Sequence, residues 1–143
     1  MIKEGKLPDK VKALKSLIIM IIHDESFPRM IMTVITFLVP VQTDNKPLKK
    51  ILLFYWEIIE KLNKDGKLKE EMILVCNSIR NDLLYPNEYL RGKTLRLVSR
   101  IMHKGDLYIY NFLGILEPIT SAITENLEHK HTYVRRNAVI ALY

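Results

Sequence analysis

Apolar side chains recur at helical spacing along most of the chain, and short polar turns separate these stretches. In the first stretch, apolar residues lie three or four positions apart from Val11 to Ile22, and lysines occupy the other side. The second stretch is apolar on nearly all sides, which is typical of a buried helix. The pattern predicts about seven helices, over residues 8–22, 27–39, 47–61, 67–84, 88–103, 112–127 and 132–143.

Residues with side chains suited to turns and helix caps separate these stretches. Ser26, Asn45 and Asn87 each precede a predicted helix, and Ser and Asn are preferred N-cap residues. Residues 63–66, with the sequence NKDG, predict a short connection between two antiparallel helices. Residues 103–111 are the least regular part of the chain, and we expect a longer connection there.

The chain also contains an internal repeat. Residues 129–143 resemble residues 85–98, about 44 positions upstream, so that Tyr133 aligns with Tyr89 and Arg135 with Arg91. A weaker third copy places Lys49 at the position of Arg91. Because a period of about 40 to 47 residues is typical of HEAT and armadillo repeats, we predict an all-α fold. We expect residues 1–143 to form a single segment of a right-handed α-solenoid of HEAT/armadillo-like helix pairs, the N-terminal part of a longer trunk.

Each copy of the repeat has a lysine or arginine at the same position, and we expect this residue to have a structural role. In helix-pair repeats a basic residue here commonly bonds the turn of the neighbouring repeat, so we predict inter-repeat contacts for Lys49, Arg91 and Arg135. We interpret the last predicted helix, 132–143, as the first helix of a pair whose second helix is missing. We therefore expect one of its faces to be partly uncovered, namely Val134, Ala138, Ala141 and Leu142.

Composition narrows the possible classes of protein. Apolar residues make up 48% of the chain and it has only five glycines, which favours a helical protein. The net charge of +6 permits anionic partners, but no recognition-helix, RNP-like or zinc-finger pattern accompanies it, so nucleic acid is not expected. Neither long apolar run, 17–22 or 30–41, reaches the ~20 residues that a membrane-spanning helix needs. A single cysteine, Cys76, fits a reducing cytosolic compartment.

We find no constellation of residues that would support catalysis. The chain lacks a glycine-rich phosphate loop, and Cys76 has no histidine partner at a recognisable spacing. His129 and His131 could be considered as a metal pair, but no further ligand follows at metal spacing, so we expect a surface turn. The sequence therefore predicts a binding protein, with no enzymatic activity, cofactor, metal or small-molecule substrate.

Three segments resemble a known family. Residues 52–59 (LLFYWEII), 72–98 (MILVCNSIRNDLLYPNEYLRGKTLRLV) and 127–143 (LEHKHTYVRRNAVIALY) resemble the N-terminal region of the coatomer beta-subunit family of the COPI coat, and more distantly the adaptin large subunits of clathrin adaptors. Residues 103–112 look expanded relative to that family. The resemblance implies a cytoplasmic, non-enzymatic coat component that is peripheral on Golgi membranes and COPI vesicles and acts in Golgi–ER and intra-Golgi transport.

The resemblance also implies partners and a binding site. The implied partners are other coatomer subunits, the delta subunit especially, and an Arf-type small GTPase. In the related adaptor subunits the GTPase contacts two apolar residues, at positions i and i+3 of the helix before a Pro-Asn turn. Here that turn is Pro86-Asn87, and the matching residues are Ile73 and Cys76. Ile73 lies off the predicted core face, whereas Cys76 lies on it.

One alternative function stays open at this point. A generic HEAT-like scaffold could bind an acidic membrane or nucleic acid through a basic helix face, with the cations at positions 91, 93, 96 and 100. Such binding would weaken steeply as the salt concentration rises.

Overall fold

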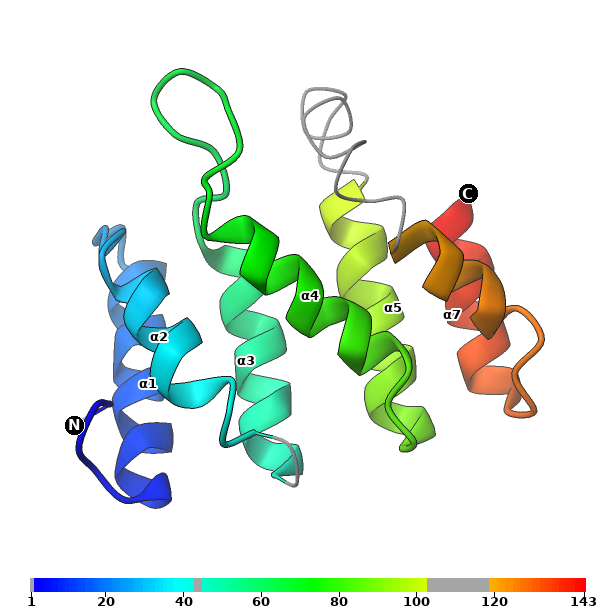
Figure 1. Ribbon diagram of the computed structural model, residues 1–143, viewed down its shortest axis with the longest axis horizontal. Coiled ribbons are helices and arrows are strands. Elements are labelled where there is room, and N and C mark those ends of the chain that lie inside the picture. Colours follow the sequence, from blue (N-terminus) through cyan, green and yellow to red (C-terminus); the bar gives the residue numbers. More distant parts are fainter. Residues whose placement is uncertain (1, 43–44, 103–118) are drawn as a thin grey trace. The chain divides into compact units, whose positions relative to one another are not determined.

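The computed structural model describes residues 2–42, 45–102 and 119–143, and these residues are mainly helical (Figure 1). The named helices are α1 (Leu7–Ile22), α2 (Met30–Leu38), α3 (Lys46–Ile58), α4 (Met72–Leu83), α5 (Glu88–Met102) and α7 (Thr132–Leu142). Residues 119–126 are also helical. Extended pairing within the described ranges amounts to one isolated bridge, between Leu62 and Leu68. The predicted all-α fold is confirmed.

The chain divides into two compact units, Met1–Glu60 and Lys61–Tyr143. Helices α1, α2 and α3 belong to the first unit, and the later helices belong to the second. The expectation that residues 1–143 form one solenoid segment stays a prediction.

In the first unit, α1 contacts α3, and their apolar faces form the core. The Asn45 side chain accepts a hydrogen bond from the Leu48 amide at 2.8 Å, which confirms its predicted role as the N-cap of α3. The prediction for Ser26 is wrong, because α2 begins only at Met30. Proline disfavours helical backbone in the residue before it, so Pro28 delays the helix. The largest buried side chains of the unit are Leu14, Leu38, Leu48, Leu52, Tyr55 and Trp56.

The connection before α4 is longer than predicted, because α3 ends at Ile58 and α4 starts at Met72. Part of it forms a small hairpin, in which the Lys69 amide donates to the Lys61 carbonyl at 2.9 Å. At its tip, Gly66 has a φ of 73°, which glycine adopts readily. The Asn63 side chain accepts from the amides of Asp65 and Lys67, both at 3.0 Å. This local bonding replaces the first turn of the helix predicted over 67–84.

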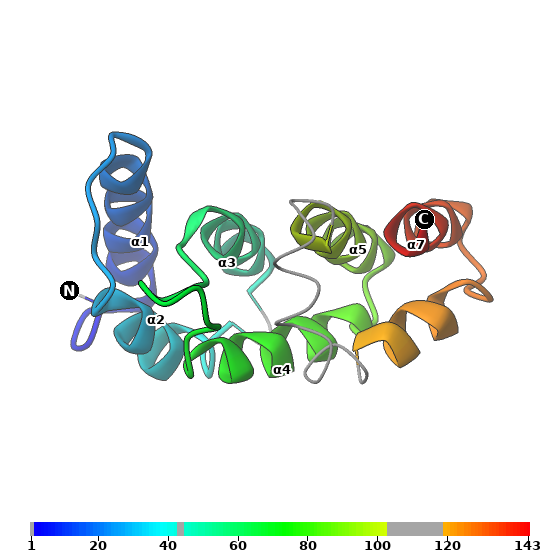
Figure 2. The same cartoon turned by 90° about the horizontal axis from the view of Figure 1, so that it is seen from above.

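In the second unit the helices form two layers. Helices α5 and α7 lie side by side in one layer, and α4 and residues 119–126 lie in the other (Figure 2). The predicted N-cap of α5 is confirmed, since Asn87 accepts from the Leu90 amide at 3.1 Å. The predicted connection at 103–111 and the start of the helix predicted over 112–127 lie outside the described residues.

The two repeat-related helices run parallel. Near their starts, the ring of Tyr133 on α7 lies against Gly92 on α5. Two turns further along, the hydroxyl of Ser99 donates to the carbonyl of Ile140 at 3.4 Å. The aligned tyrosines Tyr89 and Tyr133 stack on each other, with ring centroids 6.2 Å apart and planes 15° from parallel. Equivalent positions of the repeat are therefore neighbours in this unit.

The predicted uncovered face of α7 is wrong for most of its residues. Val134 and Ala138 are fully buried, and Ala141 is 1% exposed, because this face packs into the unit that contains α5. The exposed apolar residues of α7 are instead Val139 and Ile140, each 47% exposed. The face predicted to lack a partner therefore packs against other residues of the same unit.

A buried asparagine joins three helical segments of the second unit. Asn126 is fully buried, and its Nδ2 donates to the carbonyls of Leu83 (3.0 Å) and Ala122 (2.8 Å). Its Oδ1 accepts from the Nε of Arg91. One amide therefore satisfies a carbonyl at the end of α4 and positions a cation on α5.

We expect Asn126→Ala to lower the free energy of unfolding by about 2–3 kcal/mol, because it leaves the buried Leu83 carbonyl and Arg91 without this partner. Urea unfolding followed by circular dichroism measures the change. The control is Thr124→Ala, which removes an exposed hydroxyl bonded to the Thr120 carbonyl of its own helix and should cost at most about 0.5 kcal/mol. Equal losses in the two variants would contradict the role given to Asn126.

The contact of Gly92 with Tyr133 predicts a coupling between the two positions. A methyl group at position 92 would overlap the Tyr133 ring, so Gly92→Ala must displace the ring from its stack. In a Tyr133→Ala background the same substitution should stabilise the chain by about 1 kcal/mol, the helix-propensity gain of alanine over glycine. With Tyr133 present, we expect Gly92→Ala either to leave the stability unchanged or to lower it. A double-mutant cycle measures this coupling, and identical effects in both backgrounds would refute it.

Candidate functional site

Helix α4 exposes a stripe with apolar ends and a polar centre, which we call the α4 surface. At its start Ile73 is 50% exposed and Leu74 46%, and just beyond its end Leu84 is 42% exposed. The exposed residues between them are Asn77, Arg80 and Asn81. Exposed aliphatic residues with a polar rim are typical of protein-binding surfaces.

The helical period explains how this surface arises. Apolar residues on the opposite side of α4 are all buried and hold the helix in place, namely Met72, Val75, Cys76, Ile79 and Leu83. The predicted position of Ile73 off the core face is confirmed, and Leu74 also lies off this face. Among the described residues, Ile73 therefore remains half exposed although it is a large aliphatic side chain.

The structure separates the two residues that the resemblance marked for GTPase binding. Ile73 lies on the α4 surface, whereas Cys76 is 5% exposed and faces the interior. Burial raises the pKa of the Cys76 thiol to about 11, so the thiol stays protonated at neutral pH. Cys76 therefore supports the helix from behind, and a partner approaching α4 from outside meets Ile73 and Leu74.

The three basic residues of the repeat have different surroundings. Lys49 is 5% exposed on α3 of the first unit, and Arg91 bonds Asn126. Arg135 donates to the carbonyls of His129 (2.6 Å) and Lys130 (2.9 Å) in the turn before its own helix. The general inter-repeat role of these residues stays a prediction.

Sequence reasoning missed Asn126 as the partner of Arg91. The repeat offset aligns Asn126 with Asp82, so the sequence has a polar residue near a helix end in both copies. Both residues are buried in the structure, which the sequence pattern did not indicate.

The turn before α7, which contains His129 and His131, lies close to the start of α5. The His131 Nε2 lies 3.6 Å from the Glu88 carboxylate, and the His129 and His131 rings are 5.8 Å apart. Partial burial, followed by the charge of Arg91, lowers the pKa of His129 and favours its neutral form. Across the described residues, no cluster of three or more His, Cys, Asp or Glu side chains could hold a metal ion.

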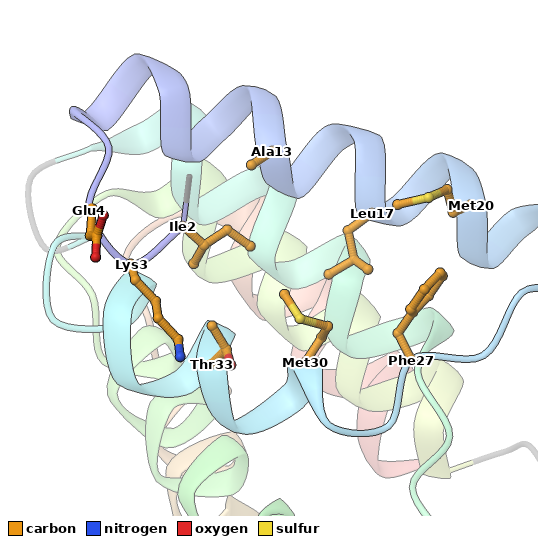
Figure 3. A pocket seen from close by; sticks show the side chains of 9 residues that line it. All are labelled: Ile2, Lys3, Glu4, Ala13, Leu17, Met20, Phe27, Met30 and Thr33. Carbon is orange, nitrogen blue, oxygen red and sulfur yellow. The ribbon is translucent and has the colours of Figure 1, made fainter.

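A cavity of about 570 Å³ lies in the first unit, between the N-terminal residues, α1 and α2 (Figure 3). Along one part of it, Leu17 and Met20 of α1 face Phe27 and Met30. The remaining lining residues are Ile2, Lys3, Glu4, Ala13 and Thr33.

None of the helices in the described part of the chain combines the length and apolar character required to cross a bilayer.

Comparison with known proteins points to one family. The model of the adaptin N-terminal region matches residues 2–143. The chain is 44% identical to coatomer subunit beta of Sus scrofa and of Drosophila melanogaster, over 142 residues in each case. It is 46% identical over 134 residues to coatomer subunit beta of Toxoplasma gondii. These matches cover 94–99% of this chain but only 11–14% of the relatives. The chain belongs to the family of the adaptin N-terminal region.

Proposed function

We propose that this chain is part of a structural subunit of a COPI-type vesicle coat that acts in Golgi–ER and intra-Golgi protein transport. Its similarity to coatomer subunit beta over nearly its whole length supports this role. The chain works by binding other proteins and not by catalysis. It is cytoplasmic and associates peripherally with Golgi and vesicle membranes.

The α4 surface is the proposed contact for an Arf-type small GTPase in its GTP-bound form. The observation that carries this assignment is the half-exposed Ile73 beside Leu74, held outward by a helix whose other face is buried. In the proposed complex the partner buries Ile73 and Leu74, and the exposed Asn77 and Arg80 in the centre of the α4 surface make polar contacts beside them. Cys76 takes part indirectly, by fixing the orientation of α4.

The other proposed partners are coat subunits, the delta subunit especially. Similarity to coatomer subunit beta supports this part of the proposal. Because the chain matches only a small share of its relatives' length, these partners can also contact regions beyond the matched segment.

The test is a binding measurement with a purified Arf-type GTPase, loaded either with a non-hydrolysable GTP analogue or with GDP. We expect binding of the GTP form alone, and we expect Ile73→Lys to weaken it by about tenfold or more, since the lysine charge would be desolvated in the interface. Ile19→Lys is the matched control, because Ile19 is 56% exposed on α1 of the first unit. It should leave the affinity within about twofold.

Equal binding of the two nucleotide forms would refute the GTPase assignment. If the Ile73→Lys variant folds normally and binds the GTPase as tightly as the unchanged chain, the α4 surface is not the GTPase contact.

A further inference from the structure

The second unit carries a basic and aromatic face on the layer opposite α4. On α5, residues Tyr89, Lys93 and Arg96 follow one another at helical spacing along one side. On α7, residues Tyr133 and Arg136 lie three apart. We call these five residues the α5/α7 face.

Contacts across the two helices place these residues on a common side. Tyr133 stacks on Tyr89 and lies against Gly92, so both rings are held at the seam between the helices. The Nζ of Lys93 lies 5.0 Å from the centre of the Tyr89 ring, within the range of a cation–π contact. Arg96 and Arg136 are exposed. The stacked rings therefore form a platform with cations around it.

The charges of the two helices are strongly unbalanced. Together α5 and α7 contain six cations and one acid, the cations being Arg91, Lys93, Arg96, Arg100, Arg135 and Arg136 and the acid Glu88. Glu88 lies at the end of the face, next to His131. Arg91 and Arg135 donate hydrogen bonds to an amide oxygen, to carbonyls and to a hydroxyl, which are uncharged partners. Because these partners are uncharged, the hydrogen bonds themselves do not neutralise the two guanidinium groups, and both add to the positive field of the two helices.

We propose that the α5/α7 face binds an acidic segment of a protein partner, with its Asp or Glu side chains on Arg96 and Arg136 and its backbone across the tyrosine platform. Two of the three cations of the α5/α7 face, Arg96 and Arg136, are exposed arginines. Arginine forms two parallel hydrogen bonds to a carboxylate, whereas lysine acts as a point charge. Tyrosine and arginine together are the residues most enriched at the centres of protein interfaces.

Two other anionic surfaces fit these observations less well. An acidic bilayer attracts lysine and arginine alike through charge density, and it does not require the paired geometry of arginine. Nucleic acid would have to contact its phosphates through a longer array of cations. The proposal goes beyond the GTPase contact, because α4 and α5 lie in different layers of the unit.

The test uses the whole 143-residue chain and a fluorescein-labelled peptide of mixed Asp and Glu with one central Tyr, followed by fluorescence anisotropy. A peptide with Asn and Gln in place of the acids is the probe control. We expect the acidic peptide alone to bind, with affinity falling as salt is raised. The double variant Arg96→Glu/Arg136→Glu should lose about tenfold or more. If that variant unfolds, Arg96→Gln/Arg136→Gln replaces it.

The matched control is Lys12→Glu/Lys15→Glu, which changes the net charge equally at two exposed lysines of α1. It should retain binding within about twofold, and so should Ile73→Lys, which separates this result from the GTPase proposal. Equal losses in the two charge-reversed pairs, or no preference for the acidic peptide, would overturn the proposal. So would binding to phosphatidylserine vesicles or duplex DNA that depends on Arg96 and Arg136, without binding of the acidic peptide.

Discussion

The second unit depends on one buried amide. Asn126 lies where the end of α4, the start of α5 and residues 119–126 meet, and it bonds groups from all three. A buried carbonyl or guanidinium without a partner costs about 1–3 kcal/mol or more, which is a large part of the stability of a small domain. Each of the two proposed surfaces includes a helix that Asn126 bonds, α4 in one case and α5 in the other.

The two-layer arrangement gives the unit two outward faces of different chemistry. Helix α4 turns an aliphatic pair outward at its start, whereas α5 and α7 turn tyrosines and arginines outward. Apolar contacts provide most of the energy of an interface, and charges mainly provide selectivity and speed of association. The two proposed contacts therefore use separate faces of the unit. The repeat itself explains the second face, because equivalent positions of α5 and α7 lie next to each other.

Local features of the sequence predicted much of this structure. The caps at Asn45 and Asn87 depend on a side chain and an amide three residues away, and the inward and outward positions of α4 depend only on the helical period. Two other features were missed. The hairpin before α4 depends on local bonds of the Asn63 side chain that compete with the helical pattern. The buried face of α7 depends on a distant contact, because α5 lies beside it. Asn126 looked like an ordinary polar residue near a helix end, because burial is set by tertiary contacts.

Hydrogen–deuterium exchange of this chain with an Arf-type GTPase tests the central claim most directly, since it reports on every helix at once. With the GTP-loaded partner, we predict slower exchange for the amides of α4, where Ile73 and Leu74 are exposed, and unchanged exchange in α5 and α7. The GDP-loaded partner should leave the pattern of the free chain unchanged. Protection confined to α5 and α7, or the same protection with both nucleotides, would contradict the assignment of the α4 surface.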